Sequence, residues 1–171
     1  AVVAWCMSHK AQVVAVDAPC KWSRLGPSRL AERKLELGGQ RIQCFSTPTR
    51  EGARNRKFYE WVFNGEALYA SLQSHYALYD GQPADRLTCI ETFPHAVACA
   101  MAGKIVSARH KAKVRREVLR NRKCDIRGLS NIDFIDAYLC AIAACKFSSG
   151  SFRKFGHPDE GFIVIPKTYG A

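Results

Sequence analysis

The sequence predicts an α/β protein in which short buried strands alternate with helices. Three short apolar runs have the length and composition of buried strands: QVVAVDAP from residue 12, LTCIETFP over 87–94 and GFIVIP over 161–166. A longer and almost unbroken apolar run over 129–147 has the length of a helix. The 171 residues suffice for one domain with a substantial core but not for two, so we expect a single domain over 1–171.

The composition favours a packed, basic and reduced protein. The chain is 47% hydrophobic and 24% charged, and its 26 Lys and Arg against 15 Asp and Glu give a net charge of +11, which favours phosphate-bearing partners. The eight cysteines are scattered without a C-x-x-C pair and are expected to be reduced core thiols. With neither an apolar run long enough to span a membrane nor a signal peptide, the expected protein is soluble and cytoplasmic.

The first 20 residues predict a helix followed by a strand that ends in an acid. AVVAWCMSHK has the pattern of a helix already under way and has no initiator Met, so we expect natural sequence upstream of Ala1. The strand from Gln12 stops at Asp17 and is closed by Pro19. Ligands of open α/β sheets bind at the carboxyl ends of strands, which makes Asp17 a candidate site residue; capping of the following turn is the alternative.

Two basic segments are candidate phosphate contacts, with a solvated charged face as the alternative in each case. The first, over 21–57, is predicted to contain a helix over about 28–37 that ends at Gly38 and Gly39. The second, over 107–123, is predicted to be largely helical. The candidate nucleic-acid contacts in them are Arg24, Arg29, Arg33, Arg109, Lys111, Lys113, Arg115 and Arg116. The aromatic residues between the segments, over 58–79, are expected to be mostly core, with stacking on bases open to those that face outward.

The second strand and the long apolar helix also carry acids. Glu91 interrupts the strand over 87–94 just before Phe93 and Pro94. Asp133 and Asp136 lie three residues apart on one face of the helix over 129–147, where two like charges repel. The helix dipole and an N-cap at Ser130 or Asn131 explain Asp133, whereas Asp136 needs a divalent cation or a neighbouring arginine.

Together the four acids predict a metal site at one edge of the sheet. Parallel strands with a helix packed on them bring such ends together, and carboxylates select hard cations such as Mg²⁺ or Mn²⁺. Two such ions about 4 Å apart would stabilise the attacking water and the leaving oxygen in phosphodiester hydrolysis. The predicted metal ligands and catalytic residues are Asp17, Glu91, Asp133 and Asp136. No Walker loop, dinucleotide fingerprint or nucleophile motif competes with this interpretation.

Several motifs, in this order along the chain, resemble the domain-of-unknown-function 429 family. They are DAP at 17–19, RIQCFSTP at 41–48, IETFPH at 90–95, KAKVRREVL at 111–119, DFIDAYLCAIAA at 133–144 and EGFIVIP at 160–166. Members are regarded as predicted nucleases with a ribonuclease H-like fold, and the D-x-x-D-A helix also resembles the last motif of Holliday-junction resolvases of the RuvC type.

The resemblance implies a ribonuclease H-like mixed sheet flanked by helices, with Asp17 ending its fourth strand, Glu91 on its fifth strand and Asp133 and Asp136 on its C-terminal helix. Such a fold has a further aspartate on its first strand, followed by a hairpin, and this chain shows neither, so we expect its domain to be N-terminally incomplete. His95 also departs from the acid of many relatives at that position.

The sequence supports three candidate functions. The first is a Mg²⁺- or Mn²⁺-dependent nuclease acting on DNA or RNA. The alternatives are a non-catalytic nucleic-acid-binding module on the same fold and a phosphotransferase or ATPase of the same superfamily. The absence of a glycine-rich phosphate loop from the sequence argues against the phosphotransferase or ATPase. The expected partner is nucleic acid rather than a membrane, and a homo-oligomer is compatible with the sequence.

Overall fold

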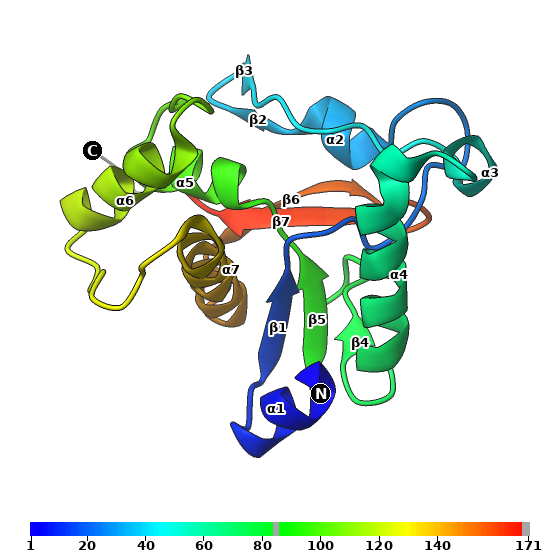
Figure 1. Cartoon of the computed structure of the whole chain (residues 1–171), viewed down its shortest axis with the longest axis horizontal. Coiled ribbons are helices and arrows are strands. Elements are labelled where there is room, and N and C mark those ends of the chain that lie inside the picture. The colour runs from blue at the N-terminus through cyan, green and yellow to red at the C-terminus, as the bar shows by residue number, and fades with distance from the viewer. Residues whose placement is uncertain (84–85, 169–171) are drawn as a thin grey trace.

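The computed structural model describes residues 1–83 and 86–168. Its centre is a five-stranded sheet in the order β1 (Val13–Val16), β5 (Thr88–Glu91), β7 (Gly161–Pro166) and β6 (Phe152–His157), with β4 (Ala77–Leu78) also paired to β5 (Figure 1). β1, β4 and β7 run parallel to β5, and β6 runs antiparallel to β7. The predicted α/β class with a mixed sheet is confirmed, as are the three predicted strands.

Helices cover the sheet from both sides. α7 (Ile132–Ser148) packs on β1 and β7 and is joined by α5 (Pro94–Ala102) and α6 (Lys111–Asn121), and together they enclose the largest apolar core. α1 (Val2–Ser8) and α4 (Glu60–Leu72) form a second core with β1 and β5. Figure 1 shows α7 and α4 on opposite sides of the β1–β5 pair.

The predicted helices at 1–10, 107–123 and 129–147 are confirmed, with ends that follow local chemistry. Asn131 is the N-cap of α7, where its side-chain oxygen accepts a hydrogen bond of 2.9 Å from the Phe134 N–H. α5 begins with Pro94 at its first turn and ends at Gly103, whose φ of +72° is the left-handed conformation that glycine tolerates best.

The predicted helix over about 28–37 is wrong in its second half. α2 (Leu30–Lys34) stops early, and the chain then forms a hairpin of β2 (Glu36–Leu37) and β3 (Gln40–Arg41). Gly38 and Gly39 both have positive φ, at 58° and 80°, which suits the two-residue turn of a tight hairpin. The Gly pair therefore turns a hairpin rather than ending a helix.

The basic segment and the tail hold further elements that the sequence did not predict. α3 (Arg50–Ala53) and the 3₁₀ turn η1 (Lys57–Tyr59) lie between β3 and α4. The segment before the last strand contains β6, which pairs with β7 over its whole length. Phe155 of β6 is buried in the main core, which explains why this stretch is a strand.

The sheet places the carboxyl ends of two parallel strands side by side. Val16, the last residue of β1, is in register with Glu91, the last residue of β5. α4 packs closely against the loop that follows β1. At Gly65 an added Cβ would lie only 2.7 Å from the Ala18 side chain. The loop carrying Asp17 is thus held against α4.

Among the residues that the structure describes, no helix is long and apolar enough to cross a membrane. All eight cysteines lie in the described part of the chain and none is in a disulfide; Cys6, Cys89, Cys99 and Cys140 are buried and Cys145 is exposed.

Candidate active site

Asp17 follows β1 directly and stands at the carboxyl edge of the parallel strands. Its side chain keeps an exposed surface, yet the protein atoms crowded around it displace water and raise the pKa of the carboxyl to about 6, with the negative charge of Asp136 as the next cause. The positive charges of Arg115 and Lys111 act in the opposite direction. Asp17 is therefore a solvent-accessible acid in the field of a second carboxylate and two cations.

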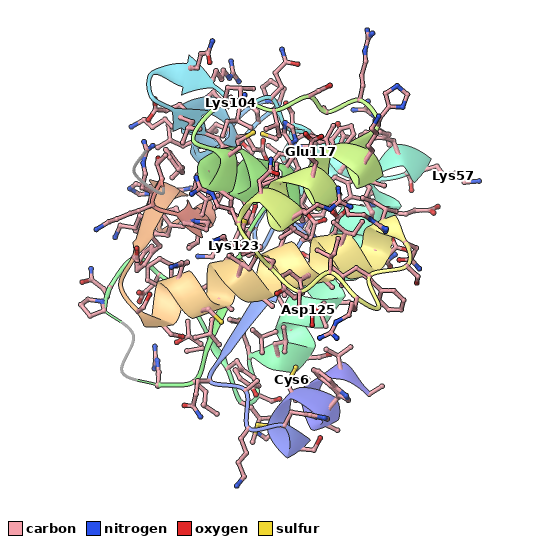
Figure 2. All side chains as sticks on the ribbon, turned by 90° about the vertical axis from the view of Figure 1, so that its left-hand side faces the viewer. Cys6, Lys57, Lys104, Glu117, Lys123 and Asp125 are labelled. Atoms are coloured by element: carbon pink, nitrogen blue, oxygen red, sulfur yellow. The ribbon has the colours of Figure 1, made fainter. Side chains whose placement is uncertain are left out.

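Asp136 reaches this position from the second turn of α7. α7 packs on β1, and Asp136 forms an ion pair with Nη1 of Arg115, which α6 contributes from the side. Figure 2 shows α6 and α7 side by side. The sequence left open whether a cation or an arginine compensates Asp136, and in this structure the partner is Arg115.

Arg115 and its neighbour His95 have polar atoms without partners. Both residues are more than nine-tenths buried, and neither Nε of Arg115 nor Nδ1 of His95 has a hydrogen-bond partner among the described residues. Burial and the charge of Arg115 both lower the pKa of His95, which keeps the imidazole neutral. The guanidinium of Arg115 is thus held at Asp136 by one nitrogen only and has unused bonding capacity.

Asp133 lies one turn before Asp136 and is exposed. It occupies the first turn of α7, where the helix dipole favours an acid, and it has no ion pair in the described structure. The structure therefore places Asp133 beside the site on the same helix, but not within the charge cluster formed by Asp17, Asp136 and Arg115.

Glu91 is held in a different environment, inside a buried network. Nη1 and Nη2 of Arg29 donate to its two carboxylate oxygens at 2.8 and 2.6 Å, and the Cys20 N–H donates at 2.8 Å. Nε of Arg29 donates to Glu32 at 2.8 Å. Burial lowers the pKa of Arg29, but Glu91 and Glu32 outweigh this effect and raise it. Arg29, which was predicted to contact phosphate, is instead the partner of a buried ion pair. Glu91 could bind a metal only if this ion pair with Arg29 opened.

This network was not foreseen because its members are far apart in sequence. Glu32 also accepts hydrogen bonds from the N–H groups of Arg29 and Thr47, at 3.1 and 2.8 Å. Glu160 accepts from the Arg24 N–H at 2.9 Å and the Leu30 N–H at 2.7 Å. The only sequence signal was the Arg29–Glu32 spacing of three residues, which places an acid and a base on one helix face.

The other predicted basic residues lie on the surface or at the edges of the site. Arg24 forms an exposed ion pair with Asp159, and Arg116 donates to the Leu129 carbonyl. Lys111 acts on the pKa of Asp17 from the first turn of α6. Among the predicted phosphate contacts, four exposed cations have no ion pair to a described residue: Arg33, Arg109, Lys111 and Lys113.

The described residues contain no group of three or more His, Cys, Asp or Glu side chains arranged to hold a metal ion. Asp17 and Asp136 have the oxygen chemistry that Mg²⁺ and Mn²⁺ prefer, and their like charges act on each other. The arrangement therefore fits a hard cation at two carboxylates, with Asp133 one turn away, and does not present the predicted four-ligand group.

A cavity of about 810 Å³ lies elsewhere, near the amino ends of β1 and β5, where Val13, Thr88 and Phe147 contribute to its lining. It contains none of the predicted site residues. The charge cluster lies at the opposite end of β1.

The fold and the site define a basic α/β protein with an acid pair at the carboxyl edge of its parallel strands. The family model described as "Protein of unknown function (DUF429)" matches residues 1–161. The chain therefore belongs to the DUF429 family, as the motifs indicated. No curated protein and no solved structure shows a significant match.

Proposed function

We propose that the protein is a divalent-metal-dependent nuclease that hydrolyses nucleic-acid phosphodiesters, with Asp17 and Asp136 as its central carboxylates. The observation that carries the proposal is the approach of these two like charges at the carboxyl end of β1, where the charge of Asp136 helps raise the pKa of Asp17. Two like charges held close together lower the stability of the folded protein. Perturbed acids at a strand end are typical of sites selected for chemistry.

The proposed cofactor is Mg²⁺ or Mn²⁺. When bound, such an ion activates water and neutralises charge on the phosphate. Asp17 and Asp136 are the residues that would hold it, and exposed Asp133 is the nearest additional carboxylate along α7. Glu91 belongs to this set only if its ion pair with Arg29 opens.

The surface around the acid pair suits a polyanionic substrate. Lys111 acts on Asp17 itself, and Lys113 and Arg109 are exposed in or just before the same helix, α6. With a net charge of +11 over the chain, these cations favour contact with the phosphate backbone of DNA or RNA.

The test is cleavage of end-labelled single-stranded, duplex and four-way-junction DNA and of RNA, with Mn²⁺ or Mg²⁺ and with EDTA. We expect metal-dependent products from the parent and none from Asp136→Asn, which should still bind the substrate. Asp125→Asn is the matched control, because Asp125 is an exposed acid paired with Arg127 in the loop before α7. Equal cleavage by the parent and Asp136→Asn would refute the assignment.

A second function, a non-catalytic nucleic-acid-binding module, is favoured by one observation. Arg115 already compensates Asp136, so the acid pair is tolerable without a metal. Under this alternative the affinity for nucleic acid still falls steeply with salt, but no substrate yields products with Mn²⁺, and Mn²⁺ does not change the melting temperature.

A further inference from the structure

Three aromatic rings form an exposed cluster on the surface between β3 and α4. Phe45, Phe58 and Trp61 are 64%, 55% and 37% exposed. The ring centroid of Phe45 lies 5.8 Å from that of Phe58 and 6.1 Å from that of Trp61. Large exposed rings held together in this way are unusual, because most such side chains are buried.

The rings come from two segments that are anchored by the interior. Tyr59 and Val62 point into the protein, so their neighbours Phe58 and Trp61 face outward. Phe45 lies in an extended segment whose ends are fixed: the Ile42 N–H donates to the Leu35 carbonyl at 3.0 Å, and the Thr47 N–H donates to Glu32 at 2.8 Å. The three rings are therefore presented by a rigid support.

Positive charge lies beside the cluster on one segment, and the exposed acid Glu60 lies between Phe58 and Trp61. The segment RNRK over 54–57, which leads directly into Phe58, supplies Arg54, Arg56 and Lys57, all of them exposed. Arg54 and Lys57 form no ion pair with any described residue, and the guanidinium of Arg56 lies 4.9 Å from the centroid of the Tyr59 ring. Tyr59 is in turn in edge contact with Phe58, at a centroid distance of 5.0 Å.

The cluster and the acid pair lie on opposite sides of the β1–β5 pair, but both are toward the carboxyl ends of these strands (Figure 1). α4 is anchored by the contact of Gly65 with Ala18, the residue after Asp17. Figure 1 shows α3 and the start of α4 across the β1–β5 pair from α6 and α7, whose first turns carry Lys111 and Asp133. A chain that runs from the cluster across the carboxyl ends of β1 and β5 would reach the candidate site.

We propose that Phe45, Phe58 and Trp61, with Arg54, Arg56 and Lys57, form a binding surface for single-stranded nucleic acid, on which unpaired bases stack and the cations contact the phosphates. Unpaired bases have exposed faces, whereas those of a duplex are covered by their neighbours. Cations beside the rings favour this occupant over an apolar protein surface. The inference extends the proposed function by naming the form of nucleic acid, and the binding itself requires no metal.

Fluorescence anisotropy of labelled (dT)15 in EDTA and low salt tests this surface. We expect the double variant Phe45→Leu/Phe58→Leu to bind at least about fivefold more weakly than the parent, because leucine keeps the apolar area but removes stacking. Trp61→Phe keeps a ring and should keep the affinity, while losing most of the tryptophan quenching that (dT)15 causes. Lys57→Gln should reduce the slope of log K against log salt by about 0.7.

Trp5→Leu is the matched control. Trp5 is 62% exposed on α1, which lies at the far end of β1 from the cluster (Figure 1), so this variant should bind (dT)15 as the parent does. Circular dichroism of each variant checks that it is folded. Equal (dT)15 affinity for the parent and the folded double variant would overturn the proposal and assign the cluster to protein contact.

The outcomes separate this inference from the proposed nuclease. Loss of (dT)15 binding in the double variant, with no metal-dependent cleavage by the parent, supports the surface and removes the nuclease. Unchanged (dT)15 affinity, with cleavage that depends on Asp136, removes the surface and keeps the nuclease.

Discussion

Two buried arginine–carboxylate pairs in this protein differ in how fully their atoms are used. In the Arg29–Glu91 pair, with side chains 1% and 4% exposed, all three guanidinium nitrogens and both carboxylate oxygens have partners. In the Arg115–Asp136 pair, at 8% and 15% exposed, only one nitrogen of Arg115 donates to Asp136, and Nε has no partner among the described residues.

The difference separates a structural pair from a candidate functional one. A buried charge network is tolerable when every member is satisfied, and Arg29 meets that condition while tying the segment after β1 to the end of β5. Arg115 leaves bonding capacity unused and stands beside a second acid, Asp17. An exchangeable cation is expected at the second pair and not at the first.

The largest effect should come from breaking the satisfied pair. Arg29→Met leaves Glu91 and Glu32 buried without their cation, and removing one member of such a pair destabilises by about 3–5 kcal/mol. Urea unfolding followed by circular dichroism measures the change. Arg24→Met is the control, since its ion pair with Asp159 is exposed and should contribute at most about 1 kcal/mol. Equal losses in the two variants would contradict the contrast.

Arg115→Met should destabilise less, by about 1–3 kcal/mol, because it removes a single charged hydrogen bond from a partly solvated acid. The variant leaves Asp17 and Asp136 uncompensated. Millimolar Mn²⁺ should therefore raise its melting temperature more than it raises that of the parent. A thermal shift assay with and without EDTA checks this, and an identical Mn²⁺ response in both proteins would show that the guanidinium does not compete with a cation.

Asp17→Asn should stabilise the protein at neutral pH. The pKa of Asp17 is about 6 in the folded chain against 3.8 for the unperturbed group, so its contribution to stability is full below the lower value and is lost as the pH rises through the higher one. Asp17→Asn cannot ionise at this position and therefore does not lose this stability. We expect a gain of a few tenths to about 1 kcal/mol at pH 7, reduced by solvent screening.

The gain from Asp17→Asn should shrink on acidification and vanish near pH 4, where the parent carboxyl is also protonated. Urea midpoints from pH 4 to 8 give the profile. A gain that is the same at every pH would show that it does not come from the charge of Asp17.

The smallest effect should come from Asp133→Asn. Asp133 is exposed in the first turn of α7, so removing its charge loses a helix-dipole contribution of about 0.3–1 kcal/mol. Its sign is opposite to that of Asp17→Asn, which makes the two variants a matched pair in one unfolding series. A stabilising Asp133→Asn would place this acid in the same repulsive cluster.

The elements with strong local patterns were predictable from the sequence, and the long-range ones were not. The apolar runs identified β1, β5, β7 and α7, and the expectation that a helix packs on the parallel strands brought Asp17 and Asp136 to the same site. β6 was missed because its alternation is interrupted by Gly156 and by charged residues, and Gly38 and Gly39 have the same composition whether they end a helix or turn a hairpin.

The roles of Arg29 and Glu91 lay beyond pattern reasoning for a physical reason. They are 62 residues apart and meet only because Arg29 enters the interior at the end of β5. Nothing in a basic segment distinguishes an arginine that faces water from one that turns inward to a glutamate. Similarly, the aromatic residues over 58–79 were expected to be mostly core, and their spacing did not separate exposed Phe58 and Trp61 from buried Tyr69.

The most direct test of the central claim is a Mn²⁺ titration of the parent, Arg115→Met and Asp136→Asn by isothermal titration calorimetry. If Asp17 and Asp136 form a cation site that Arg115 occupies, Arg115→Met should bind Mn²⁺ at least about tenfold more tightly than the parent, and Asp136→Asn should lose the binding. Identical titrations of all three proteins would contradict the account.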